Sequence, residues 1–358
     1  MKLWITLILP LFLSGIANAD FTMAYAEKAF ADYSEAKSHA LLLKEAIDQF
    51  LKETTQANLE NAKTVWTEAR KAYSSTEIYR FYGGPIDGED GPEGHINAWP
   101  LDEAYIDYVK GGAKSGIINR TQDFPLITKE LLIELNEKDG EKNISTGWHA
   151  IEFLLWGQDF YDDSAGQRPL SDYIIGQGPN ADRRRAYLSI VTDLLVEQIE
   201  SVVDAWDKNI PNSFFYQWSQ LKETETLTKA FTSLTSMAGD ELAIERMFVA
   251  YDTQFQEDEH SCFSDTTHFD LLFNFLGIRN LWLLVRDNTS LTQTNPNLVN
   301  KIDAALIRLE TDFRLFKPPF DQAIFEPEGR DQIINLVNGL QAVSEDFAAA
   351  GKDLGLTL

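Results

Sequence analysis

Cysteine is almost absent from this chain, which has 358 residues and a single thiol, Cys262. One thiol cannot close a disulfide within the chain, so the hydrophobic core must hold the fold by itself. Basic residues are also scarce, since 31 Lys and Arg stand against 56 Asp and Glu and the net charge is −25. A protein this acidic is not expected to bind nucleic acid or anionic lipid, whereas it attracts cations.

Long apolar runs are missing beyond the first residues. Residues 1–19 predict a secretory signal peptide: Lys2 supplies a positive charge, residues 3–13 are apolar, and Ala17-Asn18-Ala19 forms a small-residue cleavage site. The apolar part is too short to span a bilayer, and no later run reaches the length of about 18 residues that a membrane helix needs. We therefore expect a mature protein without a transmembrane segment, in the cell envelope, periplasmic or secreted after removal of residues 1–19.

The alternating pattern typical of β-strands is missing as well. Apolar residues instead recur near the helical period over 20–54, 56–81, 182–209 and 223–257. We therefore predict an all-α fold of two four-helix-bundle-like halves, with the functional site between or beside them. A Gly- and Pro-containing segment at 176–180 is the expected boundary. Residues 20–176 would then form the N-terminal bundle and residues 181–358 the C-terminal bundle of one larger domain.

The most informative stretch runs from Gly147 to Asp159. It predicts a short helix that ends at Gly157 and carries His149 and Glu152 on one face. Aromatic and aliphatic residues surround these two side chains, and a buried carboxylate needs a partner. Two interpretations are open, a structural His–Glu pair and a metal site with a neutral imidazole and a carboxylate as ligands. The spacing is not the His-Glu-x-x-His pattern of common zinc peptidases.

Three blocks of the chain resemble the imelysin-like family, also filed as peptidase family M75. The first is the Gly-x-His-x-x-Glu pattern of residues 147–152. The early block contains Trp66, Arg70, Tyr73, Glu77 and Arg80, and the late block extends from Glu241 to Asp270, with Thr266 where the family pattern has Asn. The resemblance covers most of the mature chain. It implies an envelope protein of a family with many members linked to iron uptake, and it implies bound metal.

The resemblance also implies a set of site residues. His149 and Glu152 would be metal ligands, and Glu77, Asp265 and His268 are the candidates to complete the ligand set. Four further residues would orient the ligands or bind an anionic chelator: Arg70, Arg80, Tyr73 and Ser264. A site of imidazole and carboxylate without thiolate suits a divalent or ferric ion, with iron favoured and zinc possible. The expected partners are the metal ion or its chelate and an envelope transport component.

Two other functions remain open from the sequence. The first is an M75-type metallopeptidase, in which a bound metal activates water and Glu152 or Glu77 serves as the catalytic carboxylate. A nucleophile pair of Ser264 and His268 is conceivable, although no oxyanion-hole signature accompanies it. The second is a non-catalytic helical scaffold, in which the same polar residues form only buried ion pairs.

Overall fold

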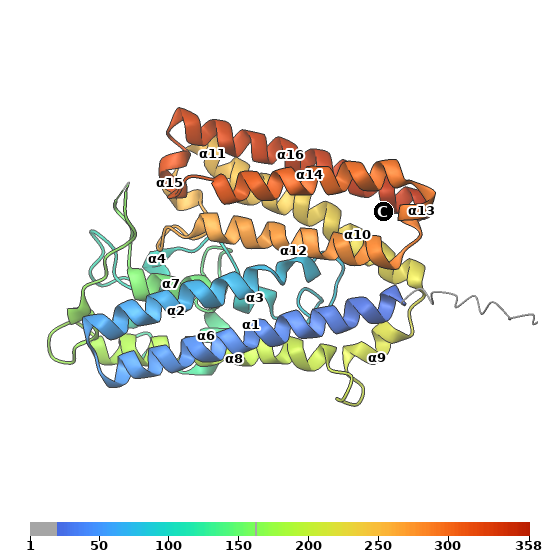
Figure 1. Cartoon of the computed structure of the whole chain (residues 1–358). Coiled ribbons are helices and arrows are strands. Elements are labelled where there is room, and N and C mark those ends of the chain that lie inside the picture. The colour runs from blue at the N-terminus through green and yellow to red at the C-terminus, as the bar shows by residue number, and fades with distance from the viewer. Residues whose placement is uncertain (1–19, 162) are drawn as a thin grey trace, which may run out of the picture.

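The computed structural model describes residues 20–161 and 163–358. The predicted signal peptide, residues 1–19, lies outside the described residues. Within the described part every regular element is a helix, apart from an isolated bridge between Val109 and Gly112, which confirms the all-α prediction (Figure 1). No helix of this part is both long and apolar enough to cross a membrane.

The first bundle is built around α1 (Phe21–Lys52). α2 (Gln56–Ser74) and α8 (Ala181–Trp206) both pack along α1, and the short α7 (Gly147–Trp156) contacts α2 and α8. One face of α1 is buried along its whole length by residues three or four positions apart, among them Tyr25, Ala29, Tyr33, Ala36, Ala40, Leu43, Ile47 and Phe50. The small alanines on this face allow the neighbouring helices to approach closely, so the stripe fixes α1 at the centre of the bundle.

The second bundle consists of α10 (Glu223–Ser236), α12 (Thr267–Asn288), α14 (Pro296–Leu315) and α16 (Pro327–Asp353). α10 continues without interruption into a π-helix, η3 (Met237–Phe248), and then into α11 (Val249–Thr253). α16 packs along both α10 and η3, and α14 lies against α12 and α16. Short elements complete this half: η4 (Gln256–Asp258), α13 (Leu291–Thr294) and α15 (Phe320–Ala323).

Residues between α2 and α8 form a mostly irregular segment interrupted by short helices. These are η1 (Glu77–Tyr79), α3 (Glu93–Ile96), α4 (Glu103–Ile106), α5 (Gly116–Asn119), α6 (Lys129–Leu135) and η2 (Leu170–Tyr173). Several of them pack against α7 or α8, so this segment covers one side of the first bundle.

The predicted boundary at 176–180 lies inside the first bundle. α8 follows that segment directly, yet it packs on α1 and α7. Its fully buried Arg184 binds Asp107 of the irregular segment, with 2.7 Å between Nε and Oδ2. Residues 176–180 therefore form a turn within one packed unit, and the chain leaves the first bundle only after Trp206.

The segment after α8 returns to the beginning of α1. α9 (Phe214–Ser219) places Trp218 so that its indole Nε1 donates to the Thr22 carbonyl at 2.8 Å. The Trp218 ring also stacks on Tyr25 with 4.6 Å between centroids, and the Thr226 hydroxyl bonds to that of Thr22 at 2.9 Å. The first turns of α1 are thus held by residues about 200 positions later.

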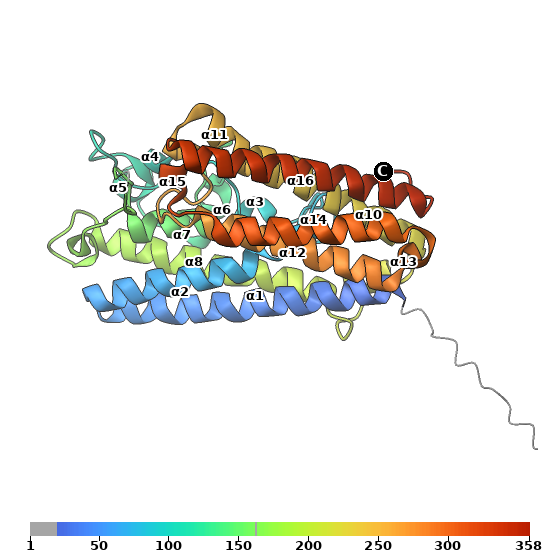
Figure 2. The same ribbon diagram turned by 45° about the horizontal axis from the view of Figure 1, so that its top comes forward.

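The two bundles meet where α2 lies beside α12. Figure 2 shows α1 and α2 on one side of the molecule and α14 and α16 on the other, with α12 between them. The loop that precedes α12 reaches α7, because Ser264 donates to Glu152. The Gly147–Trp156 helix therefore faces the second bundle.

Candidate functional site

The helix α7 enters the interior at a position that only glycine fits. Gly147 has a φ of +86°, and a Cβ at this residue would lie 2.5 Å from the carbonyl oxygen of Ile96. All ten residues of α7 are buried, and Gly157, with a φ of +77°, follows its last turn as predicted. Gly147 thus allows α7 to pack directly against the backbone at Ile96. This contact determines how far inside the protein His149 and Glu152 lie.

His149 and Glu152 form a hydrogen-bonded pair that is completely buried. Nδ1 of His149 lies 2.9 Å from Oε2 of Glu152, and Oε1 of Glu152 accepts bonds from the Ser264 amide at 3.0 Å and the Ser264 hydroxyl at 2.7 Å. Nε2 of His149 has no hydrogen-bond partner. Burial holds the pKa of His149 well below its ordinary value, and burial raises the pKa of Glu152 to about 8 against the opposing effect of Ser264. The imidazole is therefore neutral.

A second imidazole, His260, lies beside His149. The two ring centroids are 4.8 Å apart with an interplanar angle of 79°, and Trp99 packs against both rings. Nδ1 of His260 is 3.1 Å from Oδ2 of Asp270. Burial, strengthened by Arg246 and only partly opposed by Asp270, lowers the pKa of His260 to about 4. Nη2 of Arg70, a donor, also lies 3.3 Å from this Nδ1. The tautomer in which Nδ1–H donates to Asp270, and Nε2 keeps its lone pair, is the one that a ligand at Nε2 requires.

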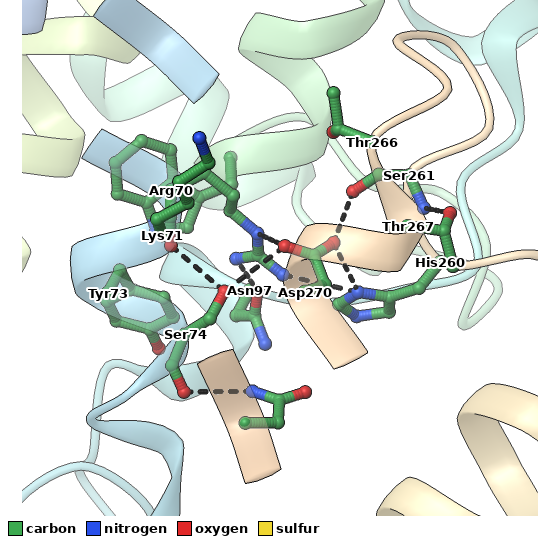
Figure 3. A network of polar contacts seen from close by, with 12 residues as sticks. Arg70, Lys71, Tyr73, Ser74, Asn97, His260, Ser261, Thr266, Thr267 and Asp270 are labelled. Carbon is green, nitrogen blue, oxygen red and sulfur yellow. Dashed lines mark hydrogen bonds and ion pairs between the residues drawn. The ribbon is translucent and has the colours of Figure 1, made fainter. Parts of the chain in front are cut away.

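Asp270 is the centre of a polar network that joins the two bundles (Figure 3). Its Oδ1 accepts bonds from Arg70 Nε and the Ser74 hydroxyl, both at 3.1 Å, and its Oδ2 accepts a bond of 2.5 Å from the Ser261 hydroxyl. Burial alone would raise the pKa of Asp270, but Arg70, followed by His260 and Ser261, outweighs burial and holds the pKa well below its usual range. Asp270 therefore remains an anion, and it fixes His260 against α2.

Glu77 occupies a second buried ion-pair network. Arg246 binds both of its carboxylate oxygens, with distances of 3.1 and 2.5 Å, and Asn97 and Asn274 donate further bonds. Burial raises the pKa of Glu77, yet Arg246, with Arg70 and Arg80, holds the pKa well below its ordinary value. The donors around Glu77 thus occupy the carboxylate that the sequence proposed as a ligand or general base.

The π-helix η3 brings Glu241 and Arg246 together. In an α-helix Glu241 and Glu245 would share one face, as their spacing suggests. The i→i+5 geometry of a π-helix instead aligns residues five apart. Arg246 therefore reaches Glu241, with 2.7 Å between Nη2 and Oε1, while Glu245 is exposed. Arg246 connects Glu241 to Glu77 and reaches the middle of the interface between the bundles.

A polar cavity of about 320 Å³ lies next to His260. Its wall includes Trp99 and His260, two arginines and several carboxylates, among them Arg80, Arg246, Glu93 and Glu241. Most of these charges are already paired, since Arg80 binds Glu93 at 3.1 Å and Arg246 binds Glu241. The cavity leads from the surface to His260, and both positively and negatively charged side chains line it.

The predicted ligand residues do not gather at one point. His149 and Glu152 contact each other, and the late-block Ser264 contacts Glu152. His268 packs its ring on Phe269, and its Nδ1 has no partner. Asp265 lies with two other acids, Glu259 and Asp321, their ligand oxygens all within 4.8 Å of one another. In the described part of the chain this is the one cluster of three or more such groups.

The remaining predicted residues have structural partners. Arg70 binds Asp270, Arg80 binds Glu93 and Glu77, and Tyr73 packs against Trp148 and the Arg70 guanidinium. The Ser264 hydroxyl bonds to Glu152 and Thr266, so the conceivable Ser264–His268 nucleophile pair does not form in this structure. Asp265 has a φ of +55° and lies one residue before Thr266, the N-cap of α12.

Sequence reasoning did not propose His260, Asp270, Glu259 or Asp321 as site residues. The first three belong to the late block of the family resemblance, in which Glu259 and His260 lie in one polar loop and Asp270 lies in the first turn of α12. Asp321 lies in α15, far along the chain, and no spacing rule connects it to the other acids. Only the packing of α15 against this loop region reveals it.

Comparisons with known proteins agree with this architecture. A protein named iron-regulated protein A from Synechococcus elongatus is 23% identical over 329 residues, which cover 87% of this chain and 80% of that protein. Two crystal structures share the fold at 13% identity: an iron-regulated protein A precursor from Parabacteroides distasonis, with a TM-score of 0.68 over 94% of this chain and 97% of that one, and an imelysin-like protein from Psychrobacter arcticum, with a TM-score of 0.66 over 94% and 95%. The family model described as Peptidase M75, Imelysin, matches residues 29–346. The chain therefore belongs to the imelysin family.

Proposed function

We propose that this imelysin-family protein binds a metal ion through Nε2 of His149 and Nε2 of His260, as a cell-envelope protein that serves iron uptake. One observation carries the proposal: the His149 ring is fully buried and neutral, and its Nε2 has no partner in the protein. A buried polar atom without a partner is costly, and a metal ion at this position would satisfy it.

The surroundings of both rings support the same proposal. Protein imidazoles that bind metals usually donate their other N–H to a carboxylate, which fixes the ring and leaves the second nitrogen free. Glu152 stands in this relation to His149, and Asp270 stands in the same relation to His260. In this arrangement Glu152 orients His149, because both of its oxygens already have partners. The histidines come from the two different bundles.

The chemistry of the donors indicates the class of metal. Two neutral imidazoles with carboxylates nearby suit iron or zinc better than calcium or magnesium. The relative named iron-regulated protein A favours iron as the cargo. The adjacent cavity of about 320 Å³ has room for a small chelator, with Arg80 and Arg246 in its wall to meet an anionic one. Location in the envelope follows from the predicted signal peptide of residues 1–19.

Metal-induced thermal shifts test the site. Zn²⁺ and Fe²⁺ are expected to raise the melting temperature of the wild type through linkage, and His149→Ala or His260→Ala should weaken metal binding at least about tenfold. His39→Ala, in α1, is the matched control and should keep the wild-type shift. Loss of stability in metal-free His149→Ala is not the readout, because removing the ring leaves Oε2 of Glu152 without its partner and costs about 1–3 kcal/mol in any case.

The outcomes separate the remaining alternatives. Equal metal-induced shifts in the wild type and His149→Ala would show that His149 is not a ligand, whereas no shift in either protein would favour the scaffold interpretation. Chelator-sensitive hydrolysis of an unfolded protein substrate, present in the wild type and absent from His149→Ala, would instead assign the peptidase activity that the family label names.

A further inference from the structure

Three acidic side chains converge outside the histidine site. Glu259 follows η4, Asp265 precedes α12, and Asp321 begins α15. One carboxylate oxygen from each lies within 4.8 Å of the others. The carboxyl group of Asp159, from the loop after α7, lies against Asp265 and accepts a bond of 2.5 Å from Gln256. Three separate segments of the chain therefore bring carboxylates to one place.

Glu259 is the member of this cluster whose burial is least compensated. Its side chain is completely buried, and neither of its oxygens has a hydrogen-bond partner. One oxygen of Asp265 is likewise buried without a partner. Taking a carboxylate out of water without compensation is expensive, so Glu259 and Asp265 require either protons or a cation.

Other buried carboxylates of this protein form ion pairs with arginine. Glu77 is paired with Arg246, Asp270 with Arg70, and Asp107 with Arg168 and Arg184. The charged neighbours that act most on Glu259 and Asp265 are instead acids, Asp321 and Asp159 foremost. Glu259 and Asp265 thus lack the arginine that compensates the other buried acids.

We propose that Glu259, Asp265 and Asp321 bind a hard divalent cation, Ca²⁺ foremost. An all-oxygen ligand set with several negative charges is the kind that Ca²⁺ prefers, whereas iron and zinc favour sites that include imidazole. Asp159 is positioned beside Asp265 to add a further oxygen. The cation supplies the positive charge that arginine supplies elsewhere in the interior.

The site goes beyond the proposed metal-uptake function and does not depend on it. Its consequence is structural support, since Glu259 and Asp265 flank the loop that carries His260 and Ser264. A cation held between this loop and α15 would fasten the loop to the second bundle. His260 would then keep its position beside His149 through a bound ion that is itself not transported.

Calcium-dependent thermal stability tests the proposal. Full-length mature protein is stripped with a chelator, the chelator is removed, and CaCl₂ is titrated. Saturating Ca²⁺ is expected to raise the melting temperature of the wild type by at least about 2 °C. Asp321→Asn and Glu259→Gln should lose this rise. Asp331→Asn, an exposed acid of α16, removes the same charge and should keep it.

Each outcome decides the question. No calcium shift in the wild type, or equal shifts in Asp321→Asn, Glu259→Gln and Asp331→Asn, would overturn the proposal. Failure of both cluster variants to fold without metal would also contradict it, because removing one of several repelling carboxylates should leave the metal-free protein at least as stable. His149→Ala should keep the calcium shift, and Asp321→Asn should keep the zinc shift, so the failure of one site is distinguishable from the failure of the other.

Discussion

His149 and His260 each face a carboxyl group with Nδ1, but the two carboxyl groups are in different charge environments. Arg70 forms an ion pair with Asp270 and holds the pKa of Asp270 well below its usual range despite burial. No arginine forms an ion pair with Glu152 in the described chain, and burial raises its pKa to about 8. The Asp270–His260 pair is thus fixed in one protonation state near neutral pH, whereas the Glu152–His149 pair carries a proton that metal binding would have to release.

This difference predicts a pH dependence of metal affinity. Binding at Nε2 of His149 requires a proton on Nδ1 and a charged Glu152 carboxylate, so below the pKa of about 8 one proton leaves Glu152 on binding. His149 is already neutral in this range and releases none. The association constant should therefore rise about tenfold per pH unit from pH 6 towards pH 8 and level off above it. Titration calorimetry in buffers of different ionisation enthalpy measures both the affinity and the proton.

Glu152→Gln provides the matched comparison for this prediction. The amide keeps the size of the side chain but cannot lose a proton, so the affinity should become nearly independent of pH over the same range. A wild-type affinity that does not change between pH 6 and pH 8 would show that Glu152 is not the group that titrates on binding.

At the scale of elements, the entry of α7 is the most constrained point of the site. Gly147 combines a positive φ with direct contact to the Ile96 backbone, whereas Gly111 has a φ of +83° and no atom within 4 Å of an added Cβ. Gly111→Ala should therefore cost about 1 kcal/mol through backbone strain alone. Gly147→Ala adds a clash that the backbone must move to relieve, so its cost should exceed that of Gly111→Ala by at least about 1 kcal/mol.

Urea denaturation of both alanine variants measures this difference. Gly147→Ala should also weaken metal binding, since the shift of α7 needed to relieve the clash displaces His149. Equal losses of stability in the two variants would mean that the approach to Ile96 is not tight in solution.

The long helices were predictable because each depends on a local pattern of apolar residues that one face of a helix repeats. The same holds for α7, whose ends follow from Gly147 and Gly157. The sequence offered both Glu241 and Glu245 as partners of Arg246, but the choice of Glu241 was not predictable, since an i, i+4 rule presumes an α-helix and η3 is a π-helix. His260 and Asp321 were not predictable either, because irregular loops and packing between bundles place them, and no sequence period records such contacts.

At the scale of the whole molecule, buried carboxylates fall into two groups with opposite effects on stability. Glu77 and Asp270 have lowered pKa values because arginine outweighs burial, so they stabilise the protein above about pH 4 and lose this effect as the pH falls. Glu152, Glu259 and Asp265 have raised pKa values, chiefly through burial. Their contribution is complete below about pH 4 and is lost as the pH rises through their folded pKa.

The metal-free protein should therefore be most stable at about pH 5 and lose stability towards pH 8, where Glu152 and Asp265 titrate. Urea midpoints between pH 4 and pH 9 in the presence of a chelator test this. Added Ca²⁺ should reduce the decline on the alkaline side, because the ion replaces the protons of the acidic cluster. A stability that stays constant from pH 5 to pH 8 would contradict the raised pKa values of Glu152 and Asp265.

The contact of α9 with the start of α1 has a consequence for synthesis. α1, the first helix of the described residues, is among the last to acquire all its neighbours, since Trp218 and Thr226 follow Thr22 by 196 and 204 residues. A nascent chain that ends before α9 leaves Phe21 and Tyr25 without this cover. Apolar surface that stays open during elongation invites aggregation. The growing polypeptide should therefore depend on a chaperone until about two-thirds of it has emerged.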